Sequence, residues 1–178
     1  MIKATDENIQ QLVYDGIDKY GPRADLNYID TSDVTDMSCL FYEKNFNGDI
    51  SGWDTHNVTT MKFMFCNCNF NGDISGWDVH NVVNMNYMFC NSLFNQAIGG
   101  WDVHNVMNTR SMFERCVFNC DISGWDVHNV EDMKWMFNNN VYDKEITWDV
   151  DIEKLFGDEY NDYLERRKLK VMEDLCVF

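Results

Sequence analysis

Apolar side chains recur along this chain with a period far longer than that of a helix or a strand. The tryptophans mark the period, with intervals of 24, 24, 24 and 23 residues between Trp53, Trp77, Trp101, Trp125 and Trp148. Self-similarity at a fixed period of this length is the signature of a repeat protein. Counting from Ile29, which precedes Trp53 by the same 24 residues, we place five repeats at 29–52, 53–76, 77–100, 101–124 and 125–147.

Each repeat carries apolar residues at equivalent positions. In the second repeat these include Val58, Phe65, Phe70 and Ile74, and like residues recur at the same places in the other repeats. A repeat of this size cannot bury its apolar side alone, whereas stacked copies turn each column of like side chains into a continuous core. We therefore expect the apolar columns to form one interior.

The pattern inside a repeat predicts a strand, a short helical turn and a loop. Around the tryptophan, Trp77 and Val79 alternate with Asp78 and His80, which is the period of a half-buried strand. The following Met-x-x-Met-Phe segment has the spacing of a helical or 3₁₀ turn. Phe-Asn-Gly-Asp then supplies turn residues that lead back to the next strand. Strands from successive repeats would pair in parallel as a small sheet.

Both ends of the repeat array require covers, because they would expose apolar columns and strand edges. At the front, Thr5 is a candidate N-cap. It precedes an apolar face at helical spacing, made of Ile9, Leu12, Val13, Ile17 and Tyr20. We therefore expect an N-terminal capping helix within residues 1–28.

At the back, the sixth Trp-Asp begins a shortened repeat at Trp148. From about Asp158 the chain is predicted to form a helix whose apolar side comprises Tyr160, Tyr163, Leu164, Val171 and Leu175. Residues 148–178 would thus hold a truncated repeat and a C-terminal capping helix. The expected fold is one domain of the α/β class, a right-handed solenoid of five 24-residue coils with a small parallel sheet and helical caps at both ends.

The repeat resembles a known family. Residues 53–65, Trp-Asp-Thr-His-Asn-Val-Thr-Thr-Met-Lys-Phe-Met-Phe, and the matching stretch at 29–41 are similar to the BspA-type leucine-rich repeat. The resemblance covers 29–147 and implies a leucine-rich-repeat-like solenoid. Members are known from bacterial surface antigens, protists and large DNA viruses, which implies adhesion or protein binding rather than catalysis. This chain departs where the family's Ser becomes His, as at His56.

Charge narrows the range of partners. The chain has 178 residues, of which 45% are hydrophobic and 15% aromatic, which is typical of a folded domain despite a net charge of −16. Such a surface repels phosphate, so nucleic acid and anionic membranes are unfavoured and a cationic partner is favoured. A basic cluster at Arg166, Arg167, Lys168 and Lys170 is interpreted as a solvated helix face.

The N-terminus becomes polar within a few residues, and no run of about 18 apolar residues occurs. We therefore expect neither a signal peptide nor a membrane span, and an intracellular or virion-associated location. The seven cysteines are then expected to be reduced thiols that pack as small apolar residues. Cys66 and Cys90 share a column, which leaves a disulfide or metal site as an alternative.

All four histidines fall in one column beside a column of aspartates. We expect both columns on the exposed face of the sheet, as a candidate binding surface comprising Asp54, His56, Asp78, His80, Asp102, His104, Asp126 and His128. Duplication of a single surface residue explains the column most simply. A divalent metal or a response to pH between about 5 and 7 is the alternative for such a row of imidazoles and carboxylates.

Two further columns are interpreted as structural ladders. One is the tryptophan series itself. The other is an asparagine series whose amides would satisfy backbone groups at the bend, at Asn57, Asn81, Asn105 and Asn129.

The chain contains no glycine-rich phosphate loop, nucleophile elbow or His-Glu-x-x-His motif. We therefore predict no catalytic residues, no cofactor and no resident metal, and a non-enzymatic scaffold for protein–protein interaction or assembly, by a protein partner or by self-association. The alternatives are a structural component of a large assembly, such as a virion or coat, and an adhesin-like surface protein.

Overall fold

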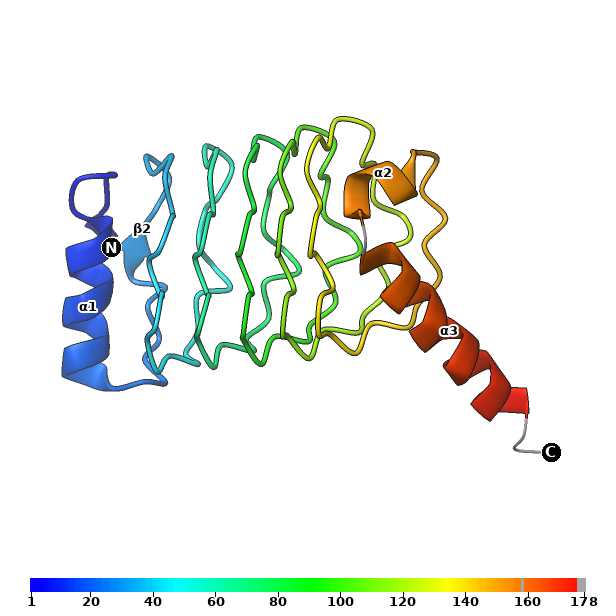
Figure 1. The fold of residues 1–178 in the computed structure, drawn as a ribbon. Helices are drawn as coiled ribbons and strands as arrows, with labels where there is room; N and C mark the ends of the chain where they lie inside the picture. The colour runs from blue at the N-terminus through cyan, green and yellow to red at the C-terminus, as the bar shows by residue number, and fades with distance from the viewer. Residues whose placement is uncertain (158, 176–178) are drawn as a thin grey trace.

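The computed structural model describes residues 1–157 and 159–175. In chain order it contains strand β1 (Ile2–Lys3), helix α1 (Ile9–Tyr20), strand β2 (Ile29–Asp30), helix α2 (Ile152–Phe156) and helix α3 (Glu159–Leu175). Figure 1 shows α1 at one end of the molecule, α2 and α3 at the other, and the repeats in between. Among the described residues, no helix is long and apolar enough to cross a membrane.

The expected fold class, an α/β leucine-rich-repeat-like solenoid with a small parallel sheet, is wrong. The sheet in the described residues has two strands of two residues each, with Ile2 paired to Ile29 and Lys3 to Asp30. The stretch around each tryptophan, where a strand was expected, is irregular backbone and turns. Parallel pairing between repeats is limited to single-residue bridges, such as Thr60 with Asn84.

Short polar side chains explain why no strand forms there. Asp54 accepts a hydrogen bond from the backbone N–H of His56 at 3.2 Å, and Asp78 accepts one from His80 in the same way. Aspartate that bonds to its own backbone two residues later stabilises a turn in competition with a strand ladder. The alternation of apolar and polar residues therefore results from a bent chain whose tryptophan and valine point inward.

The Met-x-x-Met-Phe segment also differs from the expected helical turn. Phe63 and Asn67 have φ of 57° and 54°, and the equivalent residues of the other four repeats are left-handed as well. A left-handed residue interrupts a helix, and for a bulky side chain such as Phe63 it is an uncommon conformation. The segment is instead a run of turns, closed by bonds such as Met64 N–H to the carbonyl of Met61 at 3.2 Å.

Alternate N–H groups of this run bond to the next repeat. Met61, Phe63 and Phe65 donate to carbonyls 23 residues later at 2.9–3.0 Å, whereas Met64 and Cys66 donate within their own turn. Because each repeat satisfies only half of these donors by itself, neighbouring repeats hold the left-handed turns in place. Successive 24-residue segments consequently lie side by side, as Figure 1 shows.

Aromatic columns fill the interior between these segments. Phe65 stacks on Phe41 at 5.2 Å and on Phe89 at 5.5 Å between ring centroids, with the rings within 6° of parallel. A second phenylalanine column runs beside it, and Phe89 and Phe94 of the two columns are 3.9 Å apart. Both columns are buried in the described residues, so the core is continuous through all five repeats.

The front cover is α1, helped by an aspartate. Ile9 and Val13 of α1 are buried, but the helix begins after Asn8, so Thr5 is not its N-cap. Asp6, which lies just before α1, accepts from the backbone N–H groups of Thr35 and Asp36 at 2.7 and 3.0 Å. In later repeats the preceding repeat supplies such an acceptor, as Thr35 does for Thr59 at 2.8 Å. Asp6 therefore replaces a missing repeat.

The back cover is formed by α2 and α3. Phe156 of α2 is buried and stacks on Phe137 at 5.9 Å between centroids. The hydroxyl of Tyr163 in α3 donates to the carbonyl of Lys144 at 2.7 Å and accepts from the N–H of Ile146. The side chain of Leu175, expected on the apolar face of this helix, lies outside the described part of the structure.

Candidate interaction surface

The candidate binding residues lie in turns, at equivalent positions of four repeats. Within each of four repeats, the Nδ1 atom of histidine lies 2.6–2.7 Å from the Oδ1 atom of the aspartate two residues earlier. The same oxygen accepts the backbone N–H of that histidine, so a single aspartate fixes both the turn and the ring. These are the pairs Asp54–His56, Asp78–His80, Asp102–His104 and Asp126–His128.

The pairs are open to solvent. The histidine side chains are 42–64% exposed and the aspartate side chains 47–61%. They lie at a turn rather than on a sheet face, which corrects the expected setting of these residues. Their exposure leaves the second ring nitrogen, Nε2, as the polar atom each imidazole offers to a ligand.

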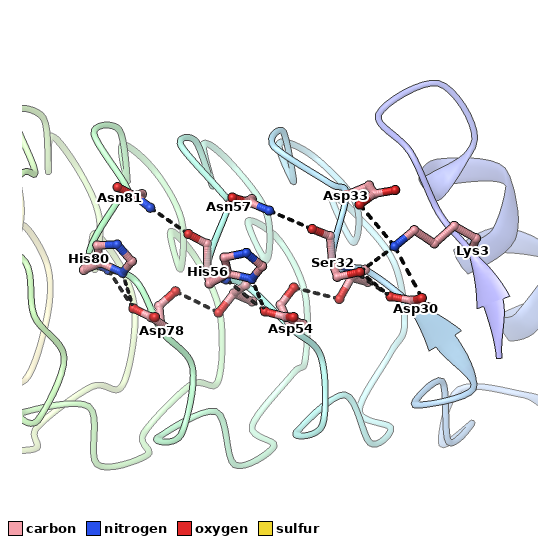
Figure 2. A network of polar contacts seen from close by, with 12 residues as sticks. Lys3, Asp30, Ser32, Asp33, Asp54, His56, Asn57, Asp78, His80 and Asn81 are labelled. Carbon is pink, nitrogen blue, oxygen red and sulfur yellow. Dashed lines mark hydrogen bonds and ion pairs between the residues drawn. The ribbon is translucent and has the colours of Figure 1, made fainter.

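Asparagine amides connect one pair to the next. The Nδ2 of Asn57 donates to the carbonyl of Ser32 at 2.8 Å. Equivalent bonds of 2.7 Å join Asn81, Asn105 and Asn129 to the histidine carbonyls of the preceding repeats, His56, His80 and His104. The backbone at His56, His80 and His104 is therefore held from the following repeat. We refer to the four Asp–His pairs and these four asparagines as the Asp–His–Asn row, of which Figure 2 shows the part from Asp54 to Asn81.

The first repeat carries a variation of the same arrangement, which Lys3 completes. Ser32 takes the place of histidine, and both its N–H and its hydroxyl donate to Asp30, at 3.1 and 2.7 Å. The ammonium of Lys3 lies 3.4 Å from Asp30 and 3.1 Å from Asp33, as Figure 2 shows. Lys3 thus pairs with the carboxylates at the end of the row where histidine is absent.

Hydrogen bonding controls the charge of the row. The bond from histidine lowers the pKa of its aspartate in each of Asp54, Asp78, Asp102 and Asp126. An ionised carboxylate can only accept, so Nδ1 of each histidine carries a proton and donates it to the aspartate. In the last repeat, Asp126 raises the pKa of His128, first by hydrogen bonding and then by charge.

The row has no metal-binding geometry, because residues 1–157 and 159–175 hold no group of three or more His, Cys, Asp or Glu side chains suited to one ion. The six described cysteines are free thiols, and Cys176 lies outside the described residues. The hydrogen bond with the neighbouring thiol of Cys90, followed by burial, raises the pKa of Cys66. The Asp–His–Asn row therefore presents hydrogen-bonding groups.

The tryptophans occupy the interior and not the row. Each indole Nε1 donates to a main-chain carbonyl 26 or 27 residues earlier in the chain, at 3.1–3.2 Å, in Trp53, Trp77, Trp101, Trp125 and Trp148. Trp148 keeps this bond although the repeat before it is one residue shorter. The indoles thus satisfy carbonyls inside the molecule.

Two features were missed by the sequence interpretation. A second asparagine ladder runs through the loop, where Asn71 N–H bonds to Asn47 Oδ1 at 2.9 Å and Asn95 N–H to Asn71 Oδ1 at 2.8 Å. Its signal was the Phe-Asn pair that begins the loop in each of the first four repeats. The other feature is an exposed aromatic row on the run of turns, whose signal is hidden because its residue type varies between repeats.

Comparison with known proteins identifies a family whose function is unknown. The profile of a family described as "Mycoplasma protein of unknown function, DUF285" matches residues 9–116 and again residues 90–162. The two matches overlap and together take in all five repeats. No curated protein and no solved structure matches the chain.

Proposed function

We propose that this chain, which belongs to the DUF285 family, is a non-enzymatic scaffold that holds a protein partner on the Asp–His–Asn row. The observation that carries this proposal is the presentation of four equivalent, half-exposed Asp–His pairs, each at 2.6–2.7 Å. The similarity of residues 53–65 to BspA-type repeats supports protein binding over catalysis.

The row is preorganised for contact. Each ring is bonded to its own aspartate, and the backbone at three of the four histidines is held by an asparagine of the following repeat, such as Asn81 on the carbonyl of His56 at 2.7 Å. Side chains that are already ordered lose little conformational entropy on binding. A partner therefore meets a surface whose geometry does not have to be selected from many rotamers.

Charge determines the chemistry of the partner. The row offers carboxylates whose pKa is lowered by hydrogen bonding from the histidines, in a chain of net charge −16. Lysine and arginine side chains are the complementary donors, and the overall field attracts a cationic surface over long range. The proposed partner is accordingly a protein with a basic surface segment.

A variant with all four histidines changed to serine tests this function. Ser32 already occupies this column in the first repeat and makes the same turn with Asp30, so the fold should be preserved. A matched control keeps the four histidines of the row and changes Ser51, Ser75 and Ser123 to His, since each lies two residues after an aspartate in the same kind of turn.

The measurement is affinity capture from the native source with quantitative mass spectrometry, using the wild type, the serine variant and the control as baits. We expect the wild type and the control to capture a common basic protein that the serine variant loses. Circular dichroism should give the same spectrum for all three. Equal capture of the same proteins by all three baits would refute the row as the contact.

A further inference from the structure

Cys66 and Cys90 occupy the same position in two successive repeats. They are the only two cysteines of the chain that are separated by one 24-residue unit. Each closes the same kind of turn, since the N–H of Cys66 donates to the carbonyl of Phe63 at 3.2 Å. The N–H of Cys90 donates to Tyr87 at the same distance. Both cysteines are free thiols.

The residues on either side hold the two cysteines in register. The preceding residues, Phe65 and Phe89, stack with ring centroids 5.5 Å apart and 4° from parallel. The following residues share a hydrogen bond, from Nδ2 of Asn91 to Oδ1 of Asn67 at 2.7 Å. The N–H of Asn67 also donates to the carbonyl of Cys90 at 2.9 Å. Because the pairs before and after them are in contact, the two cysteine side chains lie against each other.

The spacing of the pair suits a disulfide. Backbone segments joined by hydrogen bonds in this parallel register lie about 4.8 Å apart. Disulfides join residues whose Cα atoms are about 4.4–6.8 Å apart. The thiols of Cys66 and Cys90 already hydrogen-bond to each other. A bond between the two sulfur atoms therefore requires no rearrangement of the repeats.

The other buried thiols have different partners. Cys68 and Cys116 also share a column, but they are two repeats apart and Ser92 lies between them. The Sγ atom of Cys68 donates to the carbonyl of Phe46 at 3.5 Å. That of Cys116 donates to the carbonyl of Phe94 at 3.3 Å. These two thiols are packed hydrogen-bond donors, and they serve as internal controls for the pair.

The two thiols of the pair differ in their surroundings. Cys90 is partly exposed, whereas Cys66 is only 5% exposed. The hydrogen bond from Cys66 lowers the pKa of Cys90, and the charge of Arg115 adds to this effect, whereas burial and the charge of Glu114 oppose it. An accessible thiol with thiolate character beside a second cysteine is the arrangement that reacts with peroxides.

We propose that Cys66 and Cys90 form a redox site, in which a hydroperoxide oxidises Cys90 and Cys66 then closes a reversible disulfide between the second and third repeats. This site is separate from the Asp–His–Asn row, so it stands or falls independently of the proposed function.

The reaction has two steps. The thiolate of Cys90 attacks the peroxide, so that an S–O bond forms and the O–O bond breaks, and the other oxygen takes up a proton and leaves as an alcohol or as water. The thiol of Cys66 then attacks the resulting sulfenic acid, so that an S–S bond forms, the S–O bond breaks and the hydroxyl leaves with the thiol proton as water. The two thiols are oxidised and the peroxide is reduced by the same two electrons.

The disulfide should make the protein more resistant to unfolding. It closes a loop between residues 66 and 90, which restricts the unfolded chain more than the folded one, where the two residues are already in contact. The oxidised protein should therefore unfold at a higher urea concentration than the reduced protein. A dithiol reductant should reverse the effect by thiol–disulfide exchange.

Peptide mapping without reductant, after the reduced protein has been treated with hydrogen peroxide, tests the site. We expect a linked pair of peptides that contain Cys66 and Cys90. The number of titratable thiols should fall from seven to five, since two are consumed, and dithiothreitol should restore all seven.

Two serine variants separate the steps. Cys66→Ser keeps a hydroxyl donor beside Cys90 but removes the second thiol, so Cys90 should remain a sulfenic acid that dimedone traps. Cys116→Ser is the matched control, because it removes a buried thiol from a column that already holds Ser92, and it should form the disulfide as the wild type does.

Several outcomes would overturn the proposal. These are seven thiols unchanged by peroxide, a linkage that involves any other cysteine, and wild-type Cys90 oxidised to sulfinic acid without a linkage. Loss of the linkage in Cys116→Ser, or a urea midpoint of the oxidised protein no higher than that of the reduced protein, would overturn it as well.

Discussion

Glu159 should make the stability of the fold depend on pH. This first residue of α3 is 8% exposed, and neither carboxylate oxygen makes a well-formed hydrogen bond within the described residues. Burial raises the pKa of Glu159 to about 8, although the backbone N–H of Phe137 and the charge of Arg166 lower it in part. The folded protein therefore binds a proton that the unfolded chain releases near pH 4.5.

The sign and size of the effect follow from this difference. Between pH 4.5 and about 8 the folded state holds more protons than the unfolded state, so the free energy of unfolding falls as pH rises. The interval is about 3.5 pH units at about 1.4 kcal/mol each, which gives an upper bound of about 5 kcal/mol. Above pH 8 the loss is complete, because the carboxylate is then charged in both states.

Urea denaturation at pH values from 5 to 9 measures this loss, with Glu159→Gln as the comparison. Glutamine has nearly the same shape and no charge, so its variant should lack this component of the pH dependence while keeping those of all other groups. The difference between the two proteins should be small near pH 5 and grow in favour of glutamine towards pH 9. Parallel profiles for the two proteins would show that Glu159 is ionised and solvated in the fold.

Three other changes test the packing and the ends. Gly48→Ala would place a Cβ atom 2.1 Å from the carbonyl oxygen of Ala24 and should cost about 1–3 kcal/mol in urea denaturation, whereas Gly124→Ala, which meets nothing within 4 Å, should cost little. Trp101→Phe removes the 3.1 Å bond to the carbonyl of Ile74 and should lower the free energy of unfolding by about 1–3 kcal/mol, and an unchanged denaturation midpoint would contradict the role given to Nε1. Asp6→Ala should lower the free energy of unfolding by about 1–2 kcal/mol at pH 7. Burial raises the pKa of Asp6, but the hydrogen bonds from Thr35 and Asp36 outweigh it and lower this pKa. The stabilisation by Asp6 should therefore fade as pH falls below 3.8, and thermal melts of both proteins at pH 7 and pH 3 check this.

The buried columns could be predicted from the sequence, because copying presents each inward position five times. Phe65, for example, is supported by Phe41, Phe89, Phe113 and Phe137 at the same place, and the structure buries all of them. A single occurrence of Met-x-x-Met-Phe would not have separated the core from the surface. Repetition thus identified which side chains point inward, because burial depends on side-chain type and side-chain type is what the repeats preserve.

Backbone conformation could not be read in the same way. Alternation around Trp77 is equally compatible with a strand and with a turn stabilised by Asp78, and the N–H of His80 decides for the turn. Phe63 is left-handed, but the position holds no glycine, the residue type that would predict this conformation from sequence. Nor does any pattern show that Asp6 bonds to Thr35, 29 residues later, because that contact depends on how the chain closes over its first repeat.

The division of N–H donors between a repeat and its neighbour limits how such a chain can change its length. In this segment the N–H groups of Met61 and Phe63 donate to the next repeat, whereas that of Met64 donates to Met61 in its own turn. One residue added there would reverse this alternation, so apolar side chains would face solvent and N–H donors would lack acceptors. The one-residue shortening before Trp148 falls instead in the turn outside this segment, where the indole still reaches Ile122. Growth or loss of the molecule should therefore proceed by entire 24-residue units, and removal of residues 77–100 should leave a shorter protein with the same two covers.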